Sequence, residues 1–347
     1  GTRLAAADAA AAAHAESPEE ICETRRQEGC AAHSRGEHDL AIESFTQAID
    51  AAKDHEVSAL CRRQRAGSLC AAGQYSQALA DTAFDDSGGA AEPEPEAAAA
   101  VLDGDEPQTV VNSAHTIACT CLRQLGRLGE AGGQLRLALA AGERGAAEEA
   151  HILQETEHAL ARVAQFVIAG QPALALDALL PVQDRPAGTC VAAPEVTAAL
   201  ASIRLRLGDL DGAVGGYIKA AQLAHEQPTH ANSRTPAEWQ REAEIVREGI
   251  ALKAQGNERF KAKDFEGAVA AYEQAIALLP MVAPLHTNLA AGLAQADGGT
   301  RQFDAVCACE AALAIDHTFL KARVRRATCL SSLGRHEEAL DEMGTAM

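Results

Sequence analysis

One short pattern of apolar and polar residues recurs along the chain. A turn residue, usually glycine, is followed by a few polar residues and then by alanine and a second apolar residue four positions later. About a dozen residues of helical periodicity precede each copy, and the copies begin at Gly36, Gly73, Gly126, Gly170, Gly208, Lys263, Arg301 and Gly334. The spacing is 37 residues from Gly36 to Gly73 and 38 from Gly170 to Gly208. Self-similarity at such a period predicts stacked helix–turn–helix units.

Each copy is expected to be a pair of antiparallel helices joined by a tight turn, whose backbone angles glycine tolerates. The small side chains of Ala41, Ala78 and Ala268 would let paired helices touch, and Phe45 and Tyr272 would fill the gap to the next pair. A single pair cannot bury its apolar face, so the pairs must stack. Runs of Val and Ile typical of buried strands are nearly absent, and aromatic residues make up only 3%. The sequence therefore predicts an all-α fold, an α-solenoid of about eight repeats.

Two stretches interrupt the periodicity. Residues 85–110 are acidic and rich in Pro, Gly and Ala, which predicts a mobile loop, and residues 226–237 hold two prolines and read as a linker. The chain starts without Met and stops inside a helical pattern, so we expect it to be part of a longer protein. The predicted divisions are a disordered lead (1–17), an N-terminal repeat pair (18–84), the acidic loop (85–110), middle repeats (111–225), the linker (226–237) and a C-terminal three-repeat module (238–347).

Composition and motifs narrow the class of protein. The net charge of −19 argues against a general nucleic-acid binder, which needs an excess of Lys and Arg. The ten cysteines form no C-x-x-C pair, and the i,i+2 spacing of Cys119/Cys121 and Cys307/Cys309 is poor for zinc, so buried thiols in a reducing compartment are expected. No signal peptide, membrane span, nucleotide-binding loop or nucleophile motif occurs. We therefore predict a cytoplasmic, non-enzymatic protein without metal, cofactor or membrane contact.

Five polar residues in the C-terminal module form a pattern of their own. Lys253 and Asn257 are spaced i,i+4 and share one helix face, as do Lys321 and Arg325 two repeats later, with Asn288 between them. The first helices of stacked pairs line the concave face, so the five would converge on one groove. A peptide that ends in Asp carries two carboxylates, which Lys and Arg bind through charge-assisted hydrogen bonds.

The stretches GNERFKAKDFEGAVAAYEQAI, NLAAGLAQ and KARVRRATCLSSLGRHEEALDE resemble the tetratricopeptide repeat domains of co-chaperones, including J-domain co-chaperones and heat-shock organising proteins. The resemblance implies a carboxylate clamp for the C-terminal Glu-Glu-Val-Asp tail of seventy- or ninety-kilodalton heat-shock chaperones. The implied clamp residues are Lys253, Asn257, Asn288, Lys321 and Arg325. The spacing from Asn288 to Arg325 exceeds the family's, and the surplus falls in QADGGTRQ, where we expect it to lie away from the groove. No His-Pro-Asp motif occurs, so J-type activity is not supported.

The upstream repeats offer no second set of these residues. The aligned positions hold Arg26, Cys30, Arg63, Ser113, Ile117, Leu160, Ala164 and Ala198. These repeats could bind a client or second protein, or only extend the scaffold, and Arg323 and Arg326 could lie at the rim of the site or in solvent. The favoured hypothesis is a co-chaperone adaptor. The alternatives are a scaffold with a vestigial clamp, and the targeting region of an enzyme whose catalytic domain lies outside this chain.

Overall fold

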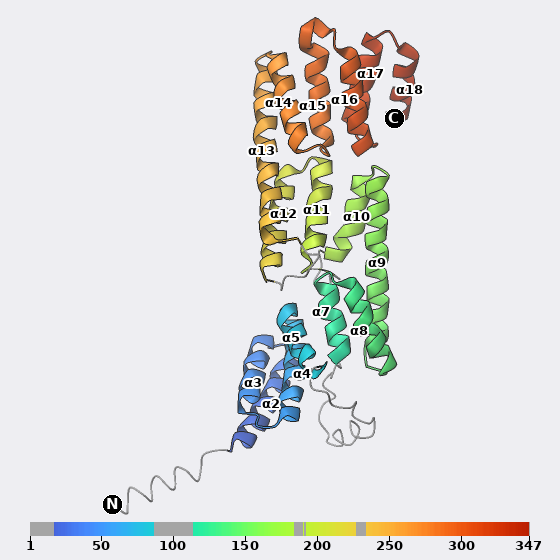
Figure 1. Cartoon of the computed structure of the whole chain (residues 1–347). Coiled ribbons are helices and arrows are strands. Elements are labelled where there is room, and N and C mark those ends of the chain that lie inside the picture. The colour runs from blue at the N-terminus through green and yellow to red at the C-terminus, as the bar shows by residue number, and fades with distance from the viewer. Residues whose placement is uncertain (1–16, 87–113, 184–189, 191, 227–233, 347) are drawn as a thin grey trace, which may run out of the picture. The chain divides into compact units, whose positions relative to one another are not determined.

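The computed structural model describes residues 17–86, 114–183, 190, 192–226 and 234–346 (Figure 1). Within these ranges all regular structure is helical and there is no strand, so the predicted all-α class is confirmed. Most of the predicted lead, acidic loop and linker lies outside the described residues, in 1–16, 87–113 and 227–233.

The chain divides into two compact units, Gly1–Leu153 and Gln154–Met347, and the division falls inside helix α9. The sequence-based domain boundaries remain predictions. The first unit holds α2 (Pro18–Ser34), α3 (His38–Ala51), α4 (His55–Ala71), α5 (Tyr75–Asp86), α7 (Ala114–Gln124), α8 (Leu128–Ala140) and the start of α9 (Ala146–Ile168). The second continues with α10 (Pro172–Gln183), α11 (Pro194–Leu207), α12 (Leu210–Glu226), α13 (Pro236–Lys261), α14 (Phe265–Leu278), α15 (Ala283–Gln295), the 3₁₀ helix η1 (Ala296–Gly299), α16 (Gln302–Ile315), α17 (Leu320–Ser332) and α18 (His336–Ala346).

The α-helices of the described residues follow one another as eight pairs, each joined by a short turn, which confirms the predicted number of repeats. The turn between α13 and α14 uses Lys263 at a φ of 62°. Six other turns carry a glycine whose φ lies between 66° and 83°, the left-handed region that disfavours other residues. These glycines are Gly36, Gly73, Gly126, Gly170, Gly208 and Gly334.

Small residues lie where paired helices touch, as predicted. Ala41, Ala78 and Ala268 are fully buried. The rings of Phe45 and Tyr272 are buried against Gly29 and Gly256, on the first helix of their own pair, whereas the sequence predicted that they fill the gap to the next pair. The buried apolar residues form several clusters between neighbouring helices rather than one centre. This is the packing expected of an array in which each repeat touches only its neighbours.

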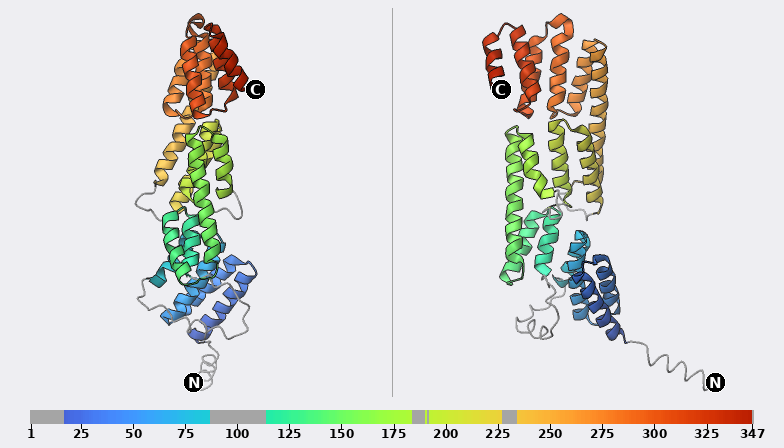
Figure 2. Two further views of the ribbon diagram at one scale, coloured as in Figure 1. Left: turned by 90° about the vertical axis from the view of Figure 1, so that its right-hand side faces the viewer. Right: turned by 180° about the vertical axis from the view of Figure 1, so that it is seen from behind.

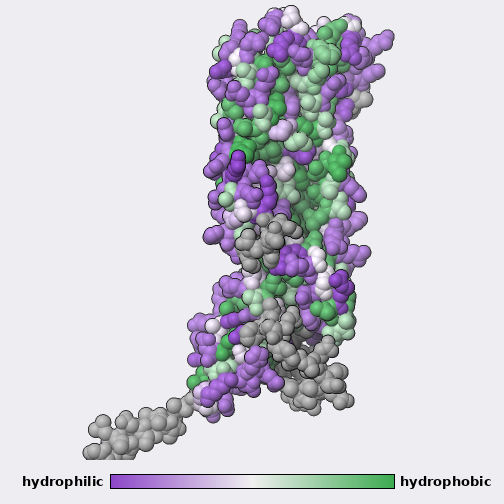
Figure 3. Space-filling view, viewed as in Figure 1, coloured by the Kyte–Doolittle hydropathy of each residue, from purple (hydrophilic) through white to green (hydrophobic). Residues whose placement is uncertain are grey.

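Helix α13 links the C-terminal repeats to the repeat before them (Figures 1 and 2). Its first half packs on α12, where the ring of Trp239 stacks on Tyr217 with centroids 6.2 Å apart, and its second half packs on α14. One apolar cluster contains residues of α11 to α15, including Val246 and Leu285. The three C-terminal repeats therefore share a core with α11 and α12. The face of the second unit drawn in Figure 3 shows apolar side chains between its helices, with polar side chains around them.

The ten cysteines are all free thiols. The buried ones, as expected for small apolar residues, are Cys22, Cys61, Cys119, Cys121, Cys190, Cys309 and Cys329. Among the described residues, no three His, Cys, Asp or Glu side chains are grouped so that they could hold a metal ion. Of the helices in the same residues, none is long and apolar enough to cross a membrane.

Candidate functional site

Helix α13 carries Lys253 and Asn257 on its second half. It begins at a capping box, in which Thr235 and Glu238 exchange side-chain hydrogen bonds with each other's backbone, and Pro236 occupies its first turn. Two glycines let α14 and its following turn approach α13 closely. A Cβ at residue 249 would lie 2.2 Å from Cδ1 of Leu279, and one at Gly256 would lie 2.5 Å from Cε1 of Tyr272. The Tyr272 ring therefore lies against the backbone that directly precedes Asn257.

Two of the predicted site residues, 31 positions apart, meet directly in the structure. The amide nitrogen of Asn288 on α15 donates to Oδ1 of Asn257 over 3.3 Å. The hydroxyl of Tyr272 on α14 donates to the same oxygen over 2.8 Å. The carbonyl oxygen of Asn257 is thus held by two donors, while no described residue accepts a hydrogen bond from its NH₂ group.

Arg325 on α17 is close enough to Tyr272 for its charge to act on the hydroxyl. Burial raises the pKa of the Tyr272 hydroxyl, and the nearby positive charge of Arg325 opposes that rise. The Arg325 side chain is half-buried, and its Nε is buried with no hydrogen-bond partner among the described residues. The Nε of Arg326, on the same helix, is also buried without such a partner, so this feature alone does not distinguish Arg325 from its neighbour.

The other cations of α17 are paired. Both Arg323 and Arg326 form ion pairs with Glu342 of α18, whose side chain is only 6% exposed. By contrast, Lys321 and Arg325 have no carboxylate within ion-pair distance among the described residues. One face of α17 is therefore neutralised by the protein itself, and the face that bears the predicted site residues is not.

The start of α17 is held from outside the C-terminal repeats. The backbone N–H and the imidazole Nδ1 of His317 lie 3.1 Å and 2.7 Å from the carbonyl oxygen of Gly170, in the turn between α9 and α10. The guanidinium of Arg323 donates to the His317 carbonyl over 2.7 Å. These bonds fix the turn that leads into Lys321, whose own side chain is exposed.

The surplus residues of the middle repeat form the 3₁₀ helix η1 between α15 and α16. Asp297 and Gly298 adopt left-handed backbone angles there, and Gln302 donates to the carbonyl oxygens of Ala294 and Gly299. Asn288 lies near the middle of α15, about two turns before η1 begins. The extra length is therefore absorbed at the end of α15 that is away from Asn288.

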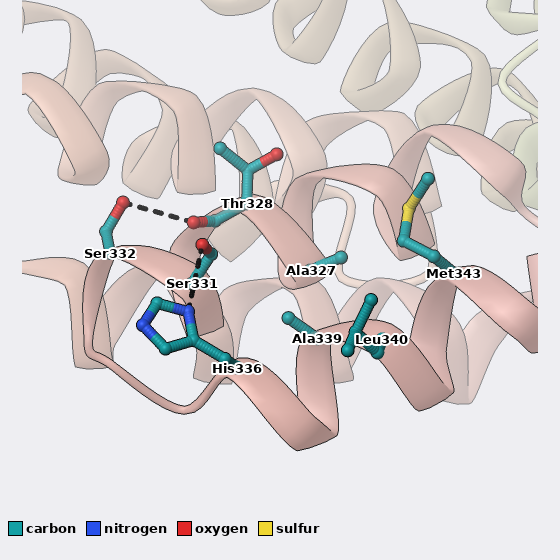
Figure 4. Close-up of a pocket in the computed structure, with 8 residues that line it drawn as sticks. All are labelled: Ala327, Thr328, Ser331, Ser332, His336, Ala339, Leu340 and Met343. Atoms are coloured by element: carbon teal, nitrogen blue, oxygen red, sulfur yellow. Dashed lines mark hydrogen bonds between the residues drawn. The ribbon is translucent and has the colours of Figure 1, made fainter.

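A pocket of about 500 Å³ lies between α17 and α18 (Figure 4). Thr328 and Ser332 on its α17 side follow Lys321 and Arg325 at helical spacing, so the four share one face of the helix. The α18 side contributes His336, Ala339, Leu340 and Met343. The pocket between α17 and α18 is therefore partly apolar and lies next to the polar face of α17.

The structure brings three of the five predicted residues together, Asn257, Asn288 and Arg325, around Tyr272. Lys253 and Lys321 each lie one helical turn from a member of that group. Sequence reasoning assigned Tyr272 only a packing role. Its hydroxyl could have indicated a second role as a hydrogen-bond donor. The equivalent buried ring in the first repeat is a phenylalanine, and a buried tyrosine needs a polar partner.

The aligned upstream positions do not form a similar group in the described residues. The side chains of Ile117 and Ala198 are buried, and Arg26 pairs with Glu23 over 2.7 Å. Ser113 lies outside the described residues.

Comparisons with known proteins agree with a repeat array. A family model of the tetratricopeptide repeat matches residues 27–55, which cover the second half of α2, all of α3 and the first residue of α4. Protein PHOX1 of Arabidopsis thaliana is 34% identical over 95 residues, which are 26% of this chain and 13% of that protein. The chain thus corresponds to about an eighth of the length of that relative.

Two solved structures also align over most of the chain. The complex of the yeast Sti1 TPR2AB domain with pHSP90 aligns with 94% of this chain and 89% of its own at 16% identity and a TM-score of 0.28. The P58(IPK) TPR domain aligns with 94% and 92% at 16% identity and a TM-score of 0.39.

Proposed function

We propose that this chain is a non-enzymatic adaptor that binds the acidic C-terminal tail of heat-shock chaperones. The binding residues would be Lys253, Asn257, Asn288, Lys321 and Arg325. The tail would be of the Glu-Glu-Val-Asp type that seventy- and ninety-kilodalton chaperones carry, in keeping with the family resemblance of the C-terminal repeats. The upstream repeats would hold a client or a second protein.

The observation that carries the proposal is the pairing of cations in the second unit. Arg323 and Arg326 form ion pairs with Glu342, whereas Arg325 has no carboxylate within ion-pair distance in the described residues. Lys253 and Lys321 likewise have no carboxylate within ion-pair distance there. Two lysines and an arginine without carboxylate partners in the described part of the chain, on the C-terminal repeats that also hold the two asparagines, suit a ligand with two carboxylates.

The chemistry of the tail fits this set. The terminal Asp offers a main-chain and a side-chain carboxylate, for which Lys and Arg provide charge-assisted hydrogen bonds. The asparagine amides donate without adding charge and can also meet the peptide backbone. Each charged contact contributes about 1.5–3 kcal/mol, and ordering of the tail takes back part of this. We therefore expect a dissociation constant in the micromolar range, which corresponds to a binding free energy of about −8 kcal/mol.

The test is calorimetry on the whole chain, because α13 ties the C-terminal repeats to α11 and α12. The ligand is a ten-residue peptide that ends in Glu-Glu-Val-Asp, compared with the same peptide amidated at its C-terminus. Lys321→Ala should weaken binding by about 10- to 100-fold, the equivalent of one charge-assisted contact. Lys261→Ala is the matched control, since Lys261 is an exposed lysine at the end of α13, paired with Glu258, two turns beyond Lys253.

Micromolar binding that is lost with the amidated peptide and with Lys321→Ala, but not with Lys261→Ala, would support the adaptor. Equal losses for the two lysine variants would show that only net charge matters. No binding by the folded wild-type chain would refute the proposal and leave a scaffold in which the five residues bind nothing.

A further inference from the structure

We propose that Tyr272 is a positioning residue of this site: with Asn288, it holds the Asn257 side chain so that the NH₂ group, and not the carbonyl oxygen, is available to a bound carboxylate. The inference rests on the proposed function and adds a residue outside the five. Tyr272 would not touch the ligand, because its hydroxyl is already used on Asn257.

The two ends of an asparagine amide have nearly the same shape but opposite hydrogen-bonding character. An Asn257 that turned its oxygen to the ligand would repel a carboxylate, and one that turns its NH₂ would donate to it. In the structure Oδ1 of Asn257 accepts from the Tyr272 hydroxyl at 2.8 Å and from Asn288 Nδ2 at 3.3 Å. Two donors on one oxygen select the orientation that a carboxylate needs.

If the Asn257 amide were turned over, its hydrogen bonds to Asn288 and Tyr272 could not form as they do in the structure. If Asn257 alone turned over, its NH₂ would face the NH₂ of Asn288, and neither could accept. If both asparagines turned over, the Tyr272 oxygen would have to accept and its hydrogen would point elsewhere. That arrangement would deprive the buried Tyr272 hydroxyl hydrogen of the acceptor that Oδ1 of Asn257 provides in the structure.

The fold holds the ring in place for this role. Tyr272 is 2% exposed, so its hydroxyl would be costly to bury without a partner. It can lie across α13 only because residue 256 is glycine, where a Cβ would come within 2.5 Å of Cε1 of the ring. Gly256 directly precedes Asn257, which places the hydroxyl beneath the amide.

The experiment is a double-mutant cycle in the whole chain, with calorimetry against the peptide ending in Glu-Glu-Val-Asp. Tyr272→Phe keeps the ring and removes the hydroxyl, and should weaken binding about 5-fold or more, the scale of one hydrogen bond. In the Asn257→Ala background the same substitution should cause no further loss, because the group that it orients is gone. A purely structural role would weaken binding equally in both backgrounds, and would overturn the proposal.

A second variant tests the orientation without touching the ring. Asn257→Asp retains an oxygen that accepts from Tyr272 and Asn288 but replaces the NH₂ with an acceptor. Peptide binding should then be lost while the unfolding midpoint stays at or above that of Asn257→Ala. A midpoint clearly below that of Asn257→Ala would show that Asn257 donates to its two neighbours and would overturn the inference.

The outcomes separate the two proposals. Wild-type binding with unchanged affinity in Tyr272→Phe would refute the positioning role and leave the adaptor function standing. An absence of wild-type binding to this peptide would refute the adaptor function and the positioning role together.

Discussion

The turn between α11 and α12 offers a test of how the second unit is packed. Gly208 caps α11 at a φ of 83°, and a Cβ built there would lie 2.6 Å from Cγ of Pro284 on α15. The proline ring is rigid and lies in the first turn of its helix, so it cannot rotate away. Gly334 is a matched control, since it has a φ of 77° in the same unit and a Cβ there would meet nothing within 4 Å.

The two substitutions differ by the clash alone. Alanine at a left-handed position costs about 1–2 kcal/mol, and the reduced entropy of the unfolded chain offsets about 0.4–1 kcal/mol of this. Gly334→Ala should therefore lower the free energy of unfolding by about 1 kcal/mol. Gly208→Ala carries the same backbone cost and an overpacking cost of about 1–3 kcal/mol. The difference between the variants should be about 1–3 kcal/mol.

Denaturant unfolding followed by tryptophan fluorescence measures this difference. Trp239 is the single tryptophan of the chain, and it is buried on α13 in the second unit. Because Asn288 follows Pro284 by one helical turn, Gly208→Ala should also weaken peptide binding more than Gly334→Ala does. Equal destabilisation by the two variants would mean that the turn does not press on α15, and the reasoning would fail.

Three further outcomes are expected, each measured by denaturant unfolding. Arg123→Met should cost about 3–5 kcal/mol, because it leaves Glu149 buried without its bidentate partner, and replacing both by apolar residues should restore much of the loss. Burial lowers the pKa of His33 below its ordinary 6.5, so the unfolded chain binds more protons there. The first unit should therefore lose stability as pH falls just below about 6.5, and this step, which precedes the titration of the carboxylates, should be absent in His33→Gln. Glu342→Gln should cost about 1–3 kcal/mol, since Arg326 loses its charged partner, whereas removal of an exposed carboxylate elsewhere should cost little.

Much of the fold was predictable because its signals are local. A glycine at most of the turns and a small alanine in the second helix of a pair act through residues that are near them in sequence. The turn glycines at Gly36, Gly73 and Gly334 adopt the predicted backbone angles, and Ala41 and Ala268 are fully buried. The pairing of α13 with α12 across the predicted linker could not be read in the same way, because the contact of Trp239 and Tyr217 depends on tertiary packing.

The residue types and spacings of the five site residues could be recognised in the sequence. Which of their charges are paired with a carboxylate could not. The sequence shows four cations on α17 but not which of them have a carboxylate partner. Only the packing of α18 decides that Arg323 and Arg326 meet Glu342 while Arg325 remains without a carboxylate. The partner lies 16 positions away for Arg326, on the next helix, and the choice depends on how the two helices are rotated against each other.

What the sequence by itself determined is the repeat: helices of a given length, the turns between them and the face on which Lys253 and Asn257 lie. These follow from backbone preferences and from the 3.6-residue period, which act within one helix pair. What only the tertiary structure decided is the state of the site, namely which charges are left unpaired and which end of the Asn257 amide is free. The pairing of charges depends on Glu342, which lies 16 positions from Arg326, and the orientation of Asn257 depends on Tyr272 and Asn288, which lie 15 and 31 positions away. No local pattern encodes contacts at these separations.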